Sequence, residues 1–197
     1  MKSETQNSAS ELNVFYTCDR NEWRRFLAEN YKTLPEVWFV FPTKGSGEAC
    51  LPYNDAVEEA LCFGWIDSTN RRLDDRSCIR RFSPRKAGSP YSRPNIERLI
   101  WLEARGMIHP DVRESVLPII SAPFEFPEDI LDELKRDETV WDNYGRLSEP
   151  YRRIRIAYIE AARERPEEFR KRLKSFMDKT RQNKLIVGYG GIEKYFV

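Results

Sequence analysis

The pattern of apolar residues changes near residue 107, and this change constrains the fold more than any other feature of the chain. Before that point the chain contains continuous aromatic and β-branched runs, such as residues 37–41, that are typical of buried strands. After Met107 no segment alternates with the period of two residues that marks a half-buried strand, and apolar residues recur at helical spacing. The sequence therefore predicts an α+β protein: a small sheet with helices on one face over residues 11–106, followed by a mostly helical C-terminal region.

Strand-like and helix-like stretches alternate within residues 11–106. Strands are expected at residues 12–16 and 37–41 and in a hairpin of residues 65–73 and 77–82, and helices at residues 21–30, 53–63 and 95–105. In the helix at 53–63 the apolar residues form one stripe, so Glu58 and Glu59 are expected to face outward. The proline-rich segment after the hairpin predicts a long loop.

The second half combines a linker, four further helices and an apolar tail. Pro118, Pro123 and Pro127 indicate a linker over residues 107–126 with a short helix at 112–117. The helical C-terminal region spans residues 127–184, with helices expected at 128–135, 138–144, 149–163 and 166–180. Residues 1–10 are polar and predict a disordered tail, whereas residues 185–197 are apolar and predict a tail that docks on the body or on a second copy of the chain.

Charge is segregated between neighbouring helices of this region. Residues 125–149 hold nine acidic and three basic residues, whereas residues 151–184 hold twelve basic and five acidic residues. Mutual attraction between the helices is the simplest explanation for this pattern.

The overall composition excludes several classes of protein. The 197 residues include 33 Lys and Arg against 32 Asp and Glu, so the formal net charge of +1 gives no global reason to expect nucleic-acid or membrane binding. No apolar run approaches the roughly 18 residues of a membrane span, and the first residues lack the apolar segment of a secretory signal. Four cysteines without a C-x-x-C pair predict reduced thiols. We therefore expect a cytoplasmic protein.

Motifs for common catalytic chemistry are missing from the sequence. The single histidine, His109, lies in a connection between helices, and no serine occupies a G-x-S-x-G elbow. Neither glycine-rich segment fits a nucleotide fingerprint, and one histidine with scattered cysteines does not make a tetrahedral metal site. The sequence therefore predicts no catalytic residue, no cofactor and no metal.

One segment, residues 65–95, is strongly basic, with eight Lys or Arg residues against three Asp. Guanidinium groups bind carboxylate and phosphate oxygens in pairs, and aromatic rings beside them supply stacking faces. We interpret this segment as a candidate strip for an anionic small molecule or an anionic protein partner. Its candidate ligand-binding residues are Trp65, Asp67, Arg71, Arg80, Arg81, Arg85, Tyr91, Ser92 and Asn95.

Three alternatives to this strip stay open. First, the arginines pair with the acidic residues of 125–149 and cover the sheet edge, while Asp67 anchors the loop by accepting hydrogen bonds from Arg80, Arg81 or Ser92. Second, the protein is an enzyme of undescribed class that uses Asp67 as acid and base. Third, the strip and the basic helices at 151–184 bind nucleic acid across a continuous positive face.

Several short blocks resemble the YdeI/OmpD-associated family of bacterial proteins, over about residues 12–182. They are A-L-C-F-G-W-I-D at 60–67, R-R-F-S-P-R at 80–85, S-R-P-N at 92–95, Glu22-Trp23, Val37-Trp38, residues 126–129, Trp141 and residues 151–153. The chain departs from the family in Tyr91, where a tryptophan is typical, and in the G-Y-G-G segment at 188–191. The resemblance implies a bacteriocin-protection or stress-resistance protein, which names a phenotype and not a reaction, and it transfers no catalytic residue.

Overall fold

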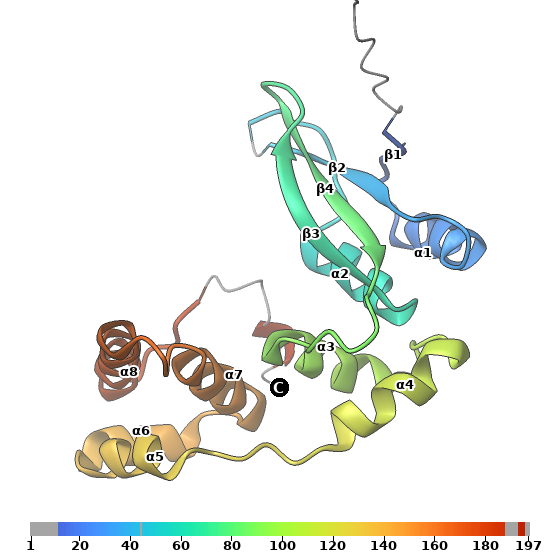
Figure 1. The fold of residues 1–197 in the computed structure, drawn as a ribbon. Coiled ribbons are helices and arrows are strands. Elements are labelled where there is room, and N and C mark those ends of the chain that lie inside the picture. Colours follow the sequence, from blue (N-terminus) through green and yellow to red (C-terminus); the bar gives the residue numbers. More distant parts are fainter. Residues whose placement is uncertain (1–11, 44, 188–192, 196–197) are drawn as a thin grey trace, which may run out of the picture. The chain divides into compact units, whose positions relative to one another are not determined.

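The protein, a computed structural model, is described at residues 12–43, 45–187 and 193–195. It divides into two compact units, residues 1–87 and 88–197, and each is described by itself (Figure 1). The expected disordered tail at 1–10 and the G-Y-G-G segment lie outside the described residues. Among the residues described, no helix combines the length and the apolar character needed to cross a membrane.

The N-terminal unit is built on a four-stranded mixed sheet of order β1-β2-β4-β3. Strand β1 (Val14–Phe15) runs parallel to β2 (Val37–Pro42), which pairs antiparallel with β4 (Ser77–Pro84). Strand β3 (Trp65–Arg72) completes the expected hairpin with β4, and Figure 1 shows the two strands side by side. A register shift between Asp67 and Asn70 interrupts this hairpin, which explains its imperfect alternation in the sequence.

Helices α1 (Arg20–Asn30) and α2 (Tyr53–Cys62) cover one face of this sheet. Trp23 of α1 is fully buried, with its ring centroid 5.0 Å from that of Phe39 on β2 and 5.6 Å from that of Phe82 on β4. Its indole N–H donates to the backbone carbonyl of Ala56 on α2 at 3.0 Å. One side chain therefore joins both helices to the sheet, as the predicted fold class requires.

The prediction that Glu58 and Glu59 face outward is wrong. Their side chains are 0% and 1% exposed, because α2 packs against α1 as well as against the sheet. Arg20 on α1 forms ion pairs with both glutamates at 3.0 and 2.6 Å, and Arg24 pairs with Glu59 at 2.6 Å. Buried carboxylates need such partners, so the apolar stripe of α2 defines only one of its two packed faces.

The C-terminal unit is helical, as predicted. Its helices are α3 (Arg93–Glu103), α4 (Pro110–Ser121), α5 (Glu128–Lys135), α6 (Glu138–Arg146), α7 (Glu149–Glu160) and α8 (Pro166–Arg181), with a 3-10 turn η1 (Glu193–Tyr195). Helices α5 to α8 share a core of Ile130, Leu134, Val140, Tyr144, Tyr151, Ile156, Ile159 and Phe176. Pro118 lies inside α4 and not in a linker, so this helix continues through a proline at which the sequence predicted a break.

Helix α3 belongs to the C-terminal unit. The boundary between the two units therefore lies at residues 87 and 88, before the boundary expected at residue 106. The reason is that α3 packs on α4 and α7. It also holds the described end of the tail: Tyr195 is 3% exposed, packs with Ile154 of α7, and lies with its ring centroid 5.6 Å from that of Trp101.

Attraction between oppositely charged helices is confirmed at two places in this unit. Arg163, just after α7, binds the Asp129 carboxylate of α5 with N–O distances of 2.5 and 3.1 Å. Arg181 at the end of α8 binds the carboxylate of Asp137, the residue before α6, at 2.8 and 3.0 Å. These ion pairs link the acidic stretch to the basic one and add to the shared apolar core.

We expect Glu59→Gln to lower the free energy of unfolding by about 2 kcal/mol, because Arg24 loses its ion pair with Glu59 and Arg20 loses one of its three carboxylate partners. Urea denaturation monitored by circular dichroism measures this change. The control is Glu29→Gln on the exposed side of α1, where we expect a change within about 0.5 kcal/mol. Equal losses in the two variants would contradict the assigned role of Glu59.

Candidate functional site

The sheet face opposite α1 and α2 carries two of the predicted site arginines. Phe39 points toward Trp23 of α1, so its neighbour Trp38 points to the opposite face. Arg81 lies directly across from Trp38 in the pairing of β2 with β4. The guanidinium carbon of Arg71 on β3 lies 3.8 Å from the centroid of the Trp38 ring. The strands thus place Trp38, Arg71 and Arg81 together, and we call this set with Glu36 the distal cluster.

Glu36, the residue before β2, connects the members of the distal cluster. Its Oε1 accepts the indole N–H of Trp38 at 2.9 Å, and its Oε2 accepts the Nε–H of Arg81 at 2.6 Å. Hydrogen bonds from Arg81 and from Trp38 lower the pKa of the Glu36 carboxyl below its usual value. Glu36 was not among the predicted site residues, because a single glutamate before a strand carries no recognisable signal in the sequence.

Asp67 lies on the helix-covered face of the sheet, where it is engaged by two partners. Its Oδ2 accepts from the hydroxyl of Tyr53 on α2 and from Nη1 of Arg80 on β4, both at 2.7 Å. The guanidinium of Arg80 also lies 4.6 Å from the Tyr53 ring centroid. The expectation that Arg80 binds Asp67 is confirmed, whereas Arg81 donates to Glu36 instead. Asp67 therefore has the pairing that a structural carboxylate needs.

Trp65 belongs to the core of the N-terminal unit. Its side chain is 1% exposed, and its indole N–H donates to the backbone carbonyl of Tyr31 at 3.1 Å. This burial leaves little of the ring to wall a ligand site, in contrast to the role expected from the sequence. Arg85 follows β4, and its backbone N–H donates to the carbonyl of Gly64 at 3.0 Å.

Other arginines of the hairpin form ion pairs within their own unit. Arg72 pairs with Asp75 at 2.6 Å and Arg76 with Glu48 at 3.2 Å, all at exposed positions. Both partners are acidic residues of the N-terminal unit. Exposed pairs of this kind contribute little stability, and they reduce the net positive charge of the strip.

The remaining predicted strip residues lie in the C-terminal unit. Tyr91 and Ser92 precede α3, and Ser92 occupies the N-cap position without a side-chain hydrogen bond to the helix. The Oδ1 atom of Asn95 accepts from Nη1 of Arg98 at 2.9 Å. The strip that appears continuous in the sequence is therefore distributed over two units, and its role as one ligand site stays a prediction.

The basic helices α7 and α8 do not present an uninterrupted row of positive charge. Arg163 pairs with Glu160 as well as Asp129, and Arg172 pairs with Glu168 at 2.8 Å. Arg181 pairs with Asp178 in addition to Asp137. Acidic partners thus alternate with these arginines, which weighs against nucleic-acid binding through this surface.

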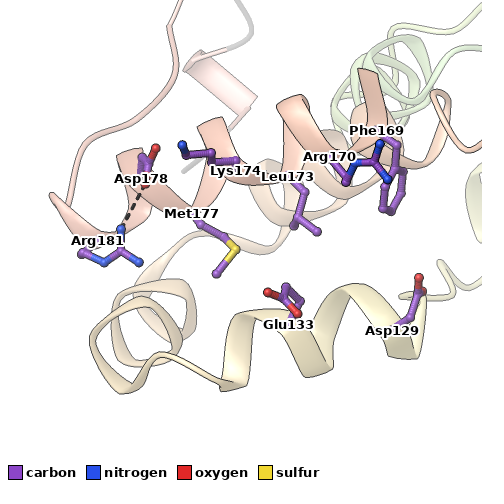
Figure 2. Close-up of a pocket in the computed structure, with 9 residues that line it drawn as sticks. All are labelled: Asp129, Glu133, Phe169, Arg170, Leu173, Lys174, Met177, Asp178 and Arg181. Carbon is purple, nitrogen blue, oxygen red and sulfur yellow. Dashed lines mark hydrogen bonds and ion pairs between the residues drawn. The ribbon is translucent and has the colours of Figure 1, made fainter. Parts of the chain in front are cut away.

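A groove of about 550 Å³ lies between α5 and α8 (Figure 2). Its apolar part comes from α8, through Phe169, Leu173 and Met177. Its charged lining residues are Asp129, Glu133, Asp178, Arg170, Lys174 and Arg181. Acidic and basic side chains are equal in number, so the groove has no electrostatic preference for an anion.

The cysteines are free, and the structure describes all of them. Cys18 is exposed and Cys62 is buried, which raises the pKa of the Cys62 thiol to about 12. Within the described ranges no group of three His, Cys, Asp or Glu residues is arranged to hold a metal ion.

Comparison with known families places both halves of the chain. Residues 123–183 match the family described as bacteriocin-protection, YdeI or OmpD-associated, and residues 15–115 match a domain of unknown function (DUF8412). No curated protein and no solved structure matches the chain. The A-L-C-F-G-W-I-D block lies in the domain of unknown function, so the match to the bacteriocin-protection family rests on helices α5 to α8. The chain therefore belongs to the family of that domain of unknown function, whose match covers just over half of it, and its helices α5 to α8 match the bacteriocin-protection, YdeI or OmpD-associated family.

Proposed function

We propose that this protein is a non-enzymatic cytoplasmic binding protein of the bacteriocin-protection type, and that its distal cluster binds an acidic segment of a partner protein. A single observation carries the proposal. Arg71 is stacked on Trp38 with 3.8 Å between its guanidinium carbon and the ring centroid, and among the described residues its side chain has no hydrogen bond and no ion pair. Stacking occupies one flat face of the guanidinium, and the N–H groups around its edge stay available for carboxylate oxygens.

Arg81 supports the same preference for an anion. Its Nε binds Glu36, and the side chains of Arg81 and Glu36 are 36% and 33% exposed. Arg71 also contributes to lowering the pKa of Glu36 through its charge, without contacting the carboxylate. The distal cluster is therefore positive overall, and Glu36 holds Arg81 in a fixed orientation before any partner binds.

The arrangement on an extended strand surface favours a segment with several carboxylates over a compact anion. Arg71 and Arg81 belong to the outer strand β3 and its neighbour β4, and Trp38 lies on the next strand, β2. Each guanidinium can bind one carboxylate of a peptide laid across the strands, and each such hydrogen bond is charge-assisted.

We expect Arg71→Ala to weaken binding of a fluorescein-labelled hexaglutamate peptide about tenfold, because one charge-assisted contact and its stacking partner are lost. Fluorescence anisotropy at low ionic strength measures the affinity. Arg72→Ala is the matched control: it removes the same charge from the adjacent residue, whose guanidinium already pairs with Asp75, and we expect less than about a twofold effect. Equal weakening in both variants, or equal binding of a hexaglutamine peptide, would contradict the proposal.

We expect the stability of Glu36→Gln to decrease less than that of the wild type when the pH is lowered. The pKa of Glu36 is lowered in the folded state, so its stabilising effect is present above the usual glutamate pKa of 4.5 and disappears as the pH falls. Thermal unfolding between about pH 5 and pH 3 therefore shows a smaller loss of stability in the variant than in the wild type. Parallel curves for the two proteins would show that Glu36 is not held in the described hydrogen bonds.

A further inference from the structure

A small cavity of about 160 Å³ lies in the C-terminal unit, where the start of α3 meets α7. Ser92, Arg93 and Pro94 line it from α3, and Ile154, Arg155 and Ala157 line it from α7. Its surface is mostly apolar, with two arginines as the charged groups of this set. The cavity shares no residue with the distal cluster, so it stands apart from the proposed function.

Arg155 is the unusual residue of this cavity. The whole residue is 4% exposed, and its Nη2 donates to the backbone carbonyl of Ile186 at 2.5 Å. Its Nε is buried without a hydrogen-bond partner, and no carboxylate among the described residues pairs with its charge. The Tyr151 ring, whose centroid lies 5.1 Å from the guanidinium carbon, supplies a cation–π contact but no opposite charge. Burying a charge is expensive unless an opposite charge compensates it, so among the described residues the charge of Arg155 is only partly compensated.

Arg153, two positions earlier on α7, shows how the same fold neutralises a largely buried arginine, whose side chain is 13% exposed. Its Nε and Nη2 donate to the two oxygens of Glu97 at 2.7 and 2.8 Å, and its Nη1 donates to Glu149 at 2.5 Å. Arg93 at the start of α3 binds the same Glu97 carboxylate at 2.5 Å. The chain thus supplies a carboxylate for Arg153 and Arg93, whereas none of the described carboxylates pairs with Arg155.

The start of α3 adds a second attraction for an anion at the same place. The N-terminus of an α-helix carries a partial positive charge, and α3 is 11 residues long. Ser92 is its N-cap residue, yet its hydroxyl makes no capping hydrogen bond. The start of α3, with its uncapped Ser92, and the positively charged Arg155 therefore line the same cavity.

We propose that this cavity binds a small carboxylate that carries an apolar body, with Arg155 binding the carboxylate and the apolar body lying among Pro94, Ile154 and Ala157. The size fits, since an engineered cavity of about 150 Å³ in another protein accommodates benzene. The mostly apolar lining disfavours a multiply charged, strongly hydrated ion such as phosphate. A ligand with one negative charge and one ring matches both parts of the site.

Isothermal titration calorimetry of the full chain with benzoate, benzamide and inorganic phosphate tests this proposal. We expect benzoate to bind at least about tenfold more tightly than benzamide, because only benzoate supplies the missing charge. Phosphate is expected to bind more weakly than benzoate. Benzoate binding no tighter than that of benzamide, or phosphate binding tighter than that of benzoate, would overturn the proposal.

Two variants and one control locate the site. Arg155→Met is expected to abolish the preference for benzoate over benzamide. Ala157→Leu fills the cavity while Arg155 stays in place, so it is expected to abolish benzoate binding in a chain that remains folded, as circular dichroism verifies. Arg152→Met is the control, since Arg152 also has a buried unpaired Nε but does not line the cavity, and benzoate binding should persist within about twofold. Unchanged binding in Ala157→Leu would place benzoate elsewhere and overturn the proposal.

Discussion

Carboxylates held by arginines at helix interfaces are the interaction on which both units depend. In the N-terminal unit the buried Glu59 joins α1 to α2, and in the C-terminal unit the buried Glu97 joins α3 to α7. Such pairs demand a partner at a fixed position, because one member left alone in the interior is strongly destabilising. These ion pairs therefore select the arrangement of the helices, while apolar residues such as Trp23 supply most of the surface that folding removes from water.

This dependence explains which parts of the fold the sequence predicts. The hairpin, the sheet-covering helices and the limits of α5 at 128–135 follow from local patterns of apolar residues, and the structure has them as expected. The burial of Glu58 and Glu59 does not follow from such patterns, because it depends on arginines about 35 to 39 residues earlier in the chain. The position of α3 is likewise set by Arg153, far along the sequence.

The candidate site was predictable only in part for the same reason. The sequence shows that residues 65–95 are rich in arginine, and it offers Arg80, Arg81 and Ser92 as partners of Asp67, of which Arg80 forms the ion pair. Which arginines are neutralised depends on distant acids: Glu36 for Arg81 and Glu48 for Arg76. The sequence also gave no means of separating Trp65, which is buried in the core, from Trp38, which supports Arg71. Membership of a family does not resolve these assignments, because function depends on the site.

The frequency of ion pairs makes an exception informative. The chain contains 33 Lys and Arg against 32 Asp and Glu, so carboxylates are abundant. The buried carboxylates of Glu59 and Glu97, for example, pair with Arg24 and Arg153. Arg155 is 4% exposed, and its contacts among the described residues are the backbone carbonyl of Ile186 and the Tyr151 ring, with no carboxylate. A backbone carbonyl carries a partial charge and leaves the guanidinium with its full positive charge in a poorly solvated place. An anion from outside that binds Arg155 therefore supplies the compensation that Glu97 supplies to Arg153.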